Sequence, residues 1–371
     1  MNGKERIMRI FQGKEVDRPA LKLWGVAIGQ KMLHPAYKPV YDLAVEVTDI
    51  MAGASSEFNV YWGSSEEVEI SVEDKPIPNS NWVDRITYLK LPNRTLRSIR
   101  RYSTIGEPGY NIEHFVKEPE DLRALLDVKY TPFPVDISSY NDAVEKTEDK
   151  GVVIFRIDHA AYAVSRIMGS ECFALMCIDE RDLILEAVET YAARIKDHVK
   201  AVLSTGIKPI FGWVGPELCI PPLVREIEFE EFVFNIDKPL CDLIHDAGGY
   251  VWVHCHGRVG KLLKRFMEMG VDVLNPIEPP PLGDVTLKEA IEIVGNGMGL
   301  EGNIEISSIL LSNEDELKNI IYNTVIESRK SDRFILCPSA GYMEYVNPTP
   351  QYINNLILYI KYGLECLTTL R

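Results

Sequence analysis

The sequence has no long apolar run. None of its 371 residues lies in an uninterrupted hydrophobic segment close to the roughly 18 residues of a membrane helix. The opening residues, MNGKERIMRIFQGKEVDRP, carry charges throughout and contain no apolar core of the kind found in a secretory signal. We therefore expect a cytoplasmic protein with no membrane partner.

Positive charge is also scarce, and the cysteines are not paired. Lys and Arg number 40 against 55 Asp and Glu, which gives a formal net charge of -15. Nucleic acids and anionic membranes require basic surfaces, so this balance argues against both as partners. The seven cysteines form no CxxC pair. In a chain without an export signal we expect reduced thiols, most of them buried.

The remaining composition is that of an ordinary soluble protein. Hydrophobic residues make up 46% and charged residues 26%, and the mean hydropathy is -0.07. A chain of this length can form one large α/β barrel or two domains.

From residue 150 onward, short apolar runs alternate with helical patterns. The predicted strands of this part are 152–157, 208–214, 250–255, 271–275, 297–301 and 333–337. Two earlier runs, 20–24 and 57–62, bring the number to eight. Strands that alternate with helices form parallel βαβ units, and eight of them predict a (β/α)8 TIM barrel. The alternative is an open doubly wound sheet, but LWGVAIGQKM after the first strand is a poor phosphate loop.

Two additions to the barrel are predicted within a single domain that covers residues 1–371. Residues 1–12 form an amphipathic helical extension with Ile7, Ile10 and Phe11 on one side. Residues 64–104 alternate between polar and apolar types, which predicts an inserted antiparallel β-hairpin region.

The stretch YVWVHCHG, residues 250–257, contains the strongest chemical signal. Because strand side chains alternate, His254 and His256 share one face with Trp252, whereas Cys255 points the other way. A single histidine is more often merely hydrogen-bonded than a metal ligand. Two adjacent buried imidazoles are harder to explain in that way, because each needs a partner.

Other strands of the predicted barrel end in further metal ligands. The active site of such a barrel lies at the carboxyl ends of its strands. Glu278 follows the sixth strand and Cys337 ends the eighth. Alone, Glu278 would be a solvated loop acid and Cys337 a small core residue. Together with His254 and His256 they supply imidazole, carboxylate and thiolate ligands, which predicts a zinc site.

Six more polar or aromatic residues lie at or just after the carboxyl ends of the predicted strands. We take Asp158, His159 and Glu217 as candidate catalytic residues. Tyr61, Trp213 and Asn303 are candidates for binding a substrate. Each of the six could equally be an ordinary residue of the rim.

Several segments resemble proteins of the uroporphyrinogen decarboxylase superfamily. They are KERIMRIFQGKEVDRP, LEGNIE and HCHGRVGKLLKRFMEMGVDVLNPIEPPPLGDVTLKEAIEIVG. True decarboxylases of the superfamily work without a metal and carry an early arginine-rich motif such as RQAGRY. The corresponding stretch here, LKLWGVAIGQKM, has neither arginine. The other branch comprises zinc-dependent methyltransferases that serve corrinoid proteins and thiol acceptors such as coenzyme M.

The resemblance also implies a set of metal ligands. The methyltransferases use a His-x-Cys pair and a later cysteine, and the related site of cobalamin-independent methionine synthase adds a glutamate. This implies His254, Glu278 and Cys337 as ligands, with His256 where the family has cysteine. The last cysteine commonly lies in a PGCG-like run, whose place here is taken by Ala340.

The resemblance therefore implies a zinc-dependent methyltransferase of one-carbon metabolism that works as a homodimer. Methyl would pass between a corrinoid on a partner protein and a thiol or similar small-molecule acceptor. One alternative is decarboxylation of a porphyrinogen or another polyacid, which needs cations at the mouth such as Lys22, Arg156 and Arg166. The other is a non-catalytic corrinoid-handling barrel.

Overall fold

A curled sheet of eight parallel strands forms the centre of the molecule. The computed structural model describes residues 1–341 and 346–370. The strand order is β1-β12-β11-β10-β9-β8-β7-β2, and the strands are β1 (Ala20–Leu21), β2 (Ile50–Ala54), β7 (Gly151–Arg156), β8 (Ile210–Val214), β9 (Tyr250–His254), β10 (Val273–Ile277), β11 (Gly299–Ile304) and β12 (Phe334–Pro338). A hydrogen bond links the first and last strands of this order. The N–H of Asp49, which directly precedes β2, donates to the carbonyl of Leu21 in β1 at 2.7 Å. The result is a TIM-barrel-like α/β fold.

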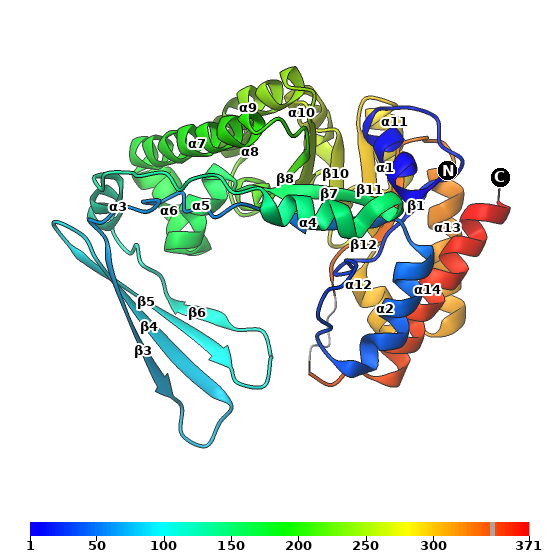
Figure 1. Ribbon diagram of the computed structural model, residues 1–371, viewed down its shortest axis with the longest axis horizontal. Helices are drawn as coiled ribbons and strands as arrows, with labels where there is room; N and C mark the ends of the chain where they lie inside the picture. The colour runs from blue at the N-terminus through cyan, green and yellow to red at the C-terminus, as the bar shows by residue number, and fades with distance from the viewer. Residues whose placement is uncertain (342–345, 371) are drawn as a thin grey trace.

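Helices follow the strands and cover the sheet. They are α2 (Lys38–Val47), α3 (Pro119–Leu126), α4 (Ser138–Thr147), α5 (Ala160–Met168), α6 (Ser170–Asp179), α7 (Arg181–Ser204), α8 (Glu226–Phe229), α9 (Asn235–Asp246), α10 (Leu263–Met269), α11 (Leu287–Val294), α12 (Ile306–Leu311), α13 (Glu314–Ser328) and α14 (Pro350–Thr369). Helices α2, α13 and α14 lie side by side (Figure 1). Among the described residues no single helix has the length and apolarity to span a bilayer. Helices α5 and α6 meet the criteria of length and composition only when taken together, and this pair is bent by 110°.

The second strand lies earlier in the chain than its predicted position. The sequence pattern predicts a strand at 57–62, but β2 is Ile50–Ala54 and Val60 to Trp62 form a turn. The run IMAGA continues the apolar pattern of the preceding helix, so periodicity does not separate the two. Tyr61 and Trp62 therefore do not end a strand, although their aromatic side chains suggest one.

A second sheet, of four antiparallel strands, projects away from the rest of the molecule (Figure 1, cyan). Its strands, in the order β3-β4-β5-β6, are β3 (Glu69–Pro76), β4 (Trp82–Lys90), β5 (Thr95–Ser103) and β6 (Tyr110–Glu113). The first three strands fall within the region 64–104, where the alternating pattern predicts antiparallel structure, and the fourth lies beyond it.

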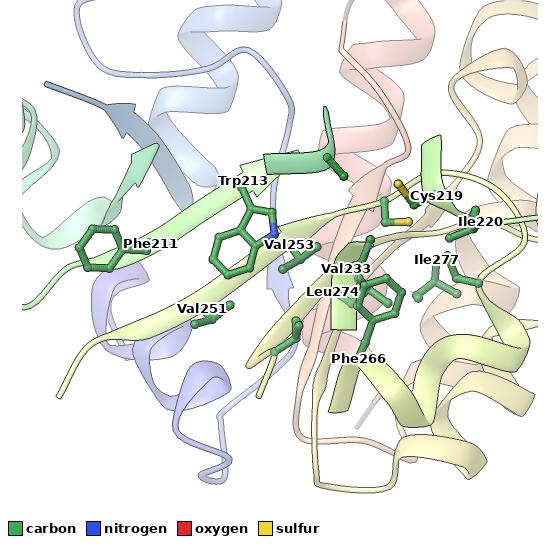
Figure 2. Close-up of a cluster of buried hydrophobic side chains, with 14 of the residues drawn as sticks. Phe211, Trp213, Cys219, Ile220, Val233, Val251, Val253, Phe266, Leu274 and Ile277 are labelled. Carbon is green, nitrogen blue, oxygen red and sulfur yellow. The ribbon is translucent and has the colours of Figure 1, made fainter. Parts of the chain in front are cut away.

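Side chains of the curled sheet form two separate apolar clusters. The inner cluster contains Trp252, Ile154, Ile210 and Ile335. Helix α1 (Gly3–Phe11) adds Ile7, Ile10 and Phe11 to this cluster. The outer cluster lies between the sheet and the helices and includes Val251, Val253 and Phe266, as Figure 2 shows. Strand β9 therefore alternates as the sequence predicts, with Trp252 inside and its two valine neighbours outside.

Histidine 198 of α7 gives the fold a predictable dependence on pH. Its ring is 8% exposed and stacks on Phe58 with 4.4 Å between the ring centroids. Burial lowers the pKa of His198 to about 4, whereas an unfolded histidine titrates near pH 6.5, as a model peptide does.

We expect the free energy of unfolding to fall as the pH drops from about 6.5 to 4, because in that window the unfolded chain binds a proton that the folded chain excludes. His198 changes the free energy of unfolding by at most about 1.4 kcal/mol per pH unit in this window. Urea titrations from pH 7 to pH 4 should therefore show a shallower loss for His198→Phe than for the wild type. Identical pH profiles for the two proteins would show that His198 does not have this effect.

Candidate active site

His254 lies inside the sheet at the end of β9. Its ring stacks on Trp252 and meets Trp24 edge to face, with ring centroids 5.9 Å and 5.4 Å apart. The His254 Nδ1 atom is 2.6 Å from Asn275 Oδ1. Burial, with the nearby His256, lowers the pKa of His254 to about 4, so the ring is neutral at pH 7. With Nδ1 as the donor to Asn275, Nε2 carries the lone pair.

His256 is held in the same way by a carboxylate. Its Nδ1 lies 3.1 Å from Glu278 Oε1, and the Gly257 N–H donates to Glu278 Oε2 at 2.9 Å. Gly257 has φ +92°, a left-handed conformation that favours glycine and that turns the chain after the histidine pair. The Glu278 carboxylate raises the pKa of His256 despite partial burial. Burial by itself would raise the carboxyl pKa of Glu278, but the hydrogen bonds from His256 and Gly257 and the two imidazoles together lower it.

The two imidazoles lie next to each other, and each is held at Nδ1. Their centroids are 4.5 Å apart, and the partners at Nδ1 leave both Nε2 atoms without a protein partner within 1–341 and 346–370. Metal-binding histidines commonly donate their other N–H to a carboxylate or amide oxygen in this way. The pair thus fits the nitrogen part of a zinc site. Across the described chain, no group of three or more His, Cys, Asp or Glu side chains is arranged to hold a metal ion.

The other two predicted ligands have different surroundings. Both oxygens of Glu278 are engaged, one by His256 and one by Gly257. Cys337 is fully buried, and burial raises the pKa of its thiol well above the usual value, with Lys22 opposing and Glu301 adding to the rise. Strand register nevertheless puts Cys337 near the level of Glu278, because Cys337 pairs with Asn303 in β11 while Gly302 pairs with Ile277 in β10.

A buried ion pair lies close to His254. Lys22 Nζ is 2.5 Å from Glu301 Oε1, and the Trp252 indole N–H donates to Glu301 Oε2 at 2.8 Å. The ammonium also lies over the Trp24 ring, 4.1 Å from its centroid. Sequence reasoning treated Lys22 as a free cation and did not find this partner. The sequence feature that could have revealed this pair is Glu301, because an acid within a buried strand needs a cation or hydrogen-bond donors.

Two of the predicted catalytic residues lie outside the mouth. His159 is 2% exposed and caps α5, because its Nδ1 accepts from the Tyr162 N–H at 3.3 Å. Its Nε2 is 3.1 Å from Asp237 Oδ2, without hydrogen-bond alignment. Asp158 pairs with Arg166 at 3.5 Å. Asp158 and His159 both line a cavity of about 200 Å³ next to residues of α7 and α9.

The predicted substrate-binding residues also face the helix layer. Trp213 is 2% exposed and belongs to the outer cluster (Figure 2), because residues 211 and 213 of β8 point outward. The Tyr61 hydroxyl donates to the Ala163 carbonyl at 2.8 Å, and burial raises its pKa to about 12. Asn303 accepts from the Thr324 hydroxyl of α13 at 3.4 Å.

Glu217, in the turn after β8, is the predicted catalytic residue that stays beside the imidazole pair. Burial raises the pKa of its carboxyl, and the His256 and His159 charges oppose that rise. Its Oε2 is buried and has no partner among the described residues. A carboxyl of this kind can exchange a proton with a group bound at the histidines.

A cavity of about 420 Å³ lies at the mouth of the sheet, near the carboxyl ends of β1 and β7. Its lining includes Lys22, Trp24, Met51, Arg156 and Trp252. Two of these residues, Trp24 and Trp252, are the rings that contact His254. The cavity and His254 therefore share these two tryptophans as neighbours.

Comparisons with known proteins agree with this geometry at the level of family and fold. Residues 141–350, more than half of the chain, match the family description "Uroporphyrinogen decarboxylase (URO-D)". Among solved structures, the chain is similar to a methyltransferase from Methanosarcina mazei, with a TM-score of 0.61 and 14% sequence identity. That match covers 97% of this chain and 98% of the other. A search of curated proteins gave no match.

Proposed function

This chain belongs to the uroporphyrinogen decarboxylase family, and from that premise we propose that it is a zinc-dependent methyltransferase. In this proposal a methyl group passes between a corrinoid, carried by a partner protein at the mouth, and a small thiol or similar acceptor. The fold-level similarity to a methyltransferase is consistent with this chemistry. The observation that carries the proposal is the pair His254 and His256, each held at Nδ1 and free at Nε2.

The proposed zinc ligands are His254, His256, Glu278 and Cys337. Asn275 and Glu278 hold the two rings, and ligation by Glu278 would exchange one of its two present hydrogen bonds for the metal. Zinc, when bound, would lower the pKa of an acceptor thiol and hold it as the nucleophilic thiolate. Glu217 is close enough to His256 for the imidazole to oppose the rise that burial causes in the pKa of its carboxyl. In this proposal the unpartnered Oε2 of Glu217 takes up the proton that the thiol releases.

The surroundings of the cations disfavour the decarboxylase alternative. Recognition of a polyacid requires several cations free to bind carboxylates. Lys22 is paired with Glu301 and Arg166 with Asp158. Among the three candidate cations, Arg156 alone has no carboxylate partner within the described part of the chain.

Turnover with a free corrinoid tests the proposed reaction. Zinc-loaded protein should demethylate methylcobalamin in the presence of 2-mercaptoethanol, with the loss of methylcobalamin followed by its visible spectrum and the methyl thioether by mass spectrometry. His254→Ala should abolish both signals because it removes one Nε2. The matched control is His245→Ala, which removes a histidine paired with Asp272 at the protein surface and should keep full activity. Zinc-loaded wild type that leaves methylcobalamin intact would contradict the proposal.

A further inference from the structure

The mouth cavity contains one cation whose charge is not balanced. Arg156 ends β7 on its inner face, two residues after Ile154 of the inner cluster. Its guanidinium lies directly over Gly53 of β2, because a Cβ on Gly53 would be 2.6 Å from Arg156 Nε and 2.8 Å from Cζ. Within residues 1–341 and 346–370 no carboxylate pairs with Arg156, although the chain as a whole carries a net charge of -15. A cation left unpaired in so acidic a chain is available for a ligand.

The other charged group in this cavity is already neutralised. Lys22 Nζ lies 2.5 Å from Glu301, and both side chains are buried. The Gln30 side chain is also engaged, since its Oε1 accepts from the Ala27 N–H at 2.9 Å. The cavity therefore presents a single positive charge, and a ligand that carries one anionic group balances it.

The rest of the lining is largely apolar. Trp24, Met51, Ile154 and Trp252 belong to this wall, and the volume of about 420 Å³ lies in the range of small-molecule sites. A ligand with an apolar body would fit against these side chains.

We propose that the mouth cavity binds an organic monoanion with an apolar, ring-sized body, whose anionic group pairs with Arg156 and whose body lies against Trp24. The proposal rests on the proposed function in taking this compound as the small-molecule substrate, because the same indole contacts His254. It excludes a polycarboxylate as the preferred ligand. In this proposal Arg156 is the residue that makes the cavity prefer an anionic ligand over a neutral one.

Calorimetric titration with three matched probes tests the proposal: 2-naphthoate, the neutral 2-naphthamide and naphthalene-2,6-dicarboxylate. The wild type should bind 2-naphthoate about tenfold or more tightly than 2-naphthamide, the scale of one hydrogen bond to a charged group. The dicarboxylate should bind more weakly than 2-naphthoate, because its second carboxylate finds no cation. Absence of 2-naphthoate binding at millimolar concentration, or tighter binding of the dicarboxylate, would overturn the proposal.

Three variants and one control test whether Arg156 causes the preference for the anion. Arg156→Gln should remove the preference for naphthoate over naphthamide, and Arg156→Lys should restore part of it. Gly53→Ala keeps every charge but displaces the guanidinium, so it should weaken naphthoate binding more than naphthamide binding. Arg100→Gln, an equal loss of charge at an exposed residue of β5, is the control and should bind like the wild type. A preference that survives in Arg156→Gln, or that Arg100→Gln loses equally, would overturn the assignment.

Zinc content measured on the same samples separates this proposal from the proposed function. Wild-type protein that binds zinc but shows no preference for naphthoate over naphthamide would reject only the anion site. Selective naphthoate binding by a protein that takes up no zinc would reject only the methyltransferase.

Discussion

Lys22→Met should destabilise the protein by about 3 to 5 kcal/mol, because it leaves a buried carboxylate without its cation. Glu301 is fully buried and Lys22 is 5% exposed, so solvent screens this pair little. The Trp252 N–H would remain as a donor to Glu301, but neutral donors do not balance the charge. The loss is measured as the free energy of unfolding in urea at pH 7.

A second substitution distinguishes the buried charge from lost packing. The double variant Lys22→Met/Glu301→Gln removes both charges and keeps a side-chain oxygen for the Trp252 bond, so it should recover much of the stability lost in Lys22→Met. Lys38→Met is the matched control, since it breaks an exposed ion pair with Asp42 and should change stability little. Equal losses in Lys22→Met and the double variant would mean that the buried charge is not the cause.

Local covalent geometry explains what the sequence could predict about the site. Strand alternation correctly places Trp252 in the inner cluster and Val251 and Val253 in the outer one, because it depends only on the pleat of a strand. The same rule, applied to β8, puts Trp213 on the outer face with Phe211. The prediction for Trp213 considered its place at the strand end and did not consider its face.

Contacts between distant parts of the chain explain what the sequence could not predict. Lys22 and Glu301 are 279 residues apart, and nothing local to either residue identifies the other. The hydrogen bond from Gly257 to Glu278 depends on the left-handed turn after the histidines, so the engagement of both carboxylate oxygens emerges only in three dimensions. Strand β2 was misplaced for a different reason, since five residues are too few to show a period.

Two cysteine substitutions should affect zinc differently, with a loss of affinity at Cys337 and no change at Cys255. Cys337 lies in β12 near the level of Glu278, so Cys337→Ser should lose a thiolate ligand together with the negative charge that offsets the ion. Zinc affinity should fall by about tenfold or more, since losing even a partner of a ligand has that effect. The fold should be retained, because a serine hydroxyl can keep the contact that the thiol makes with Glu301.

Cys255→Ser is the matched control, because Cys255 is equally buried but belongs to the outer cluster. A hydroxyl in that apolar layer should cost about 1 to 3 kcal/mol of stability and leave zinc content unchanged, although Cys255 lies between the two histidines in the chain. Zinc per chain, measured by mass spectrometry after dialysis against a competing chelator, compares the two variants directly. Zinc retained by Cys337→Ser but lost by Cys255→Ser would show that the metal lies on the other face of the sheet, and the proposed ligand set would then be wrong.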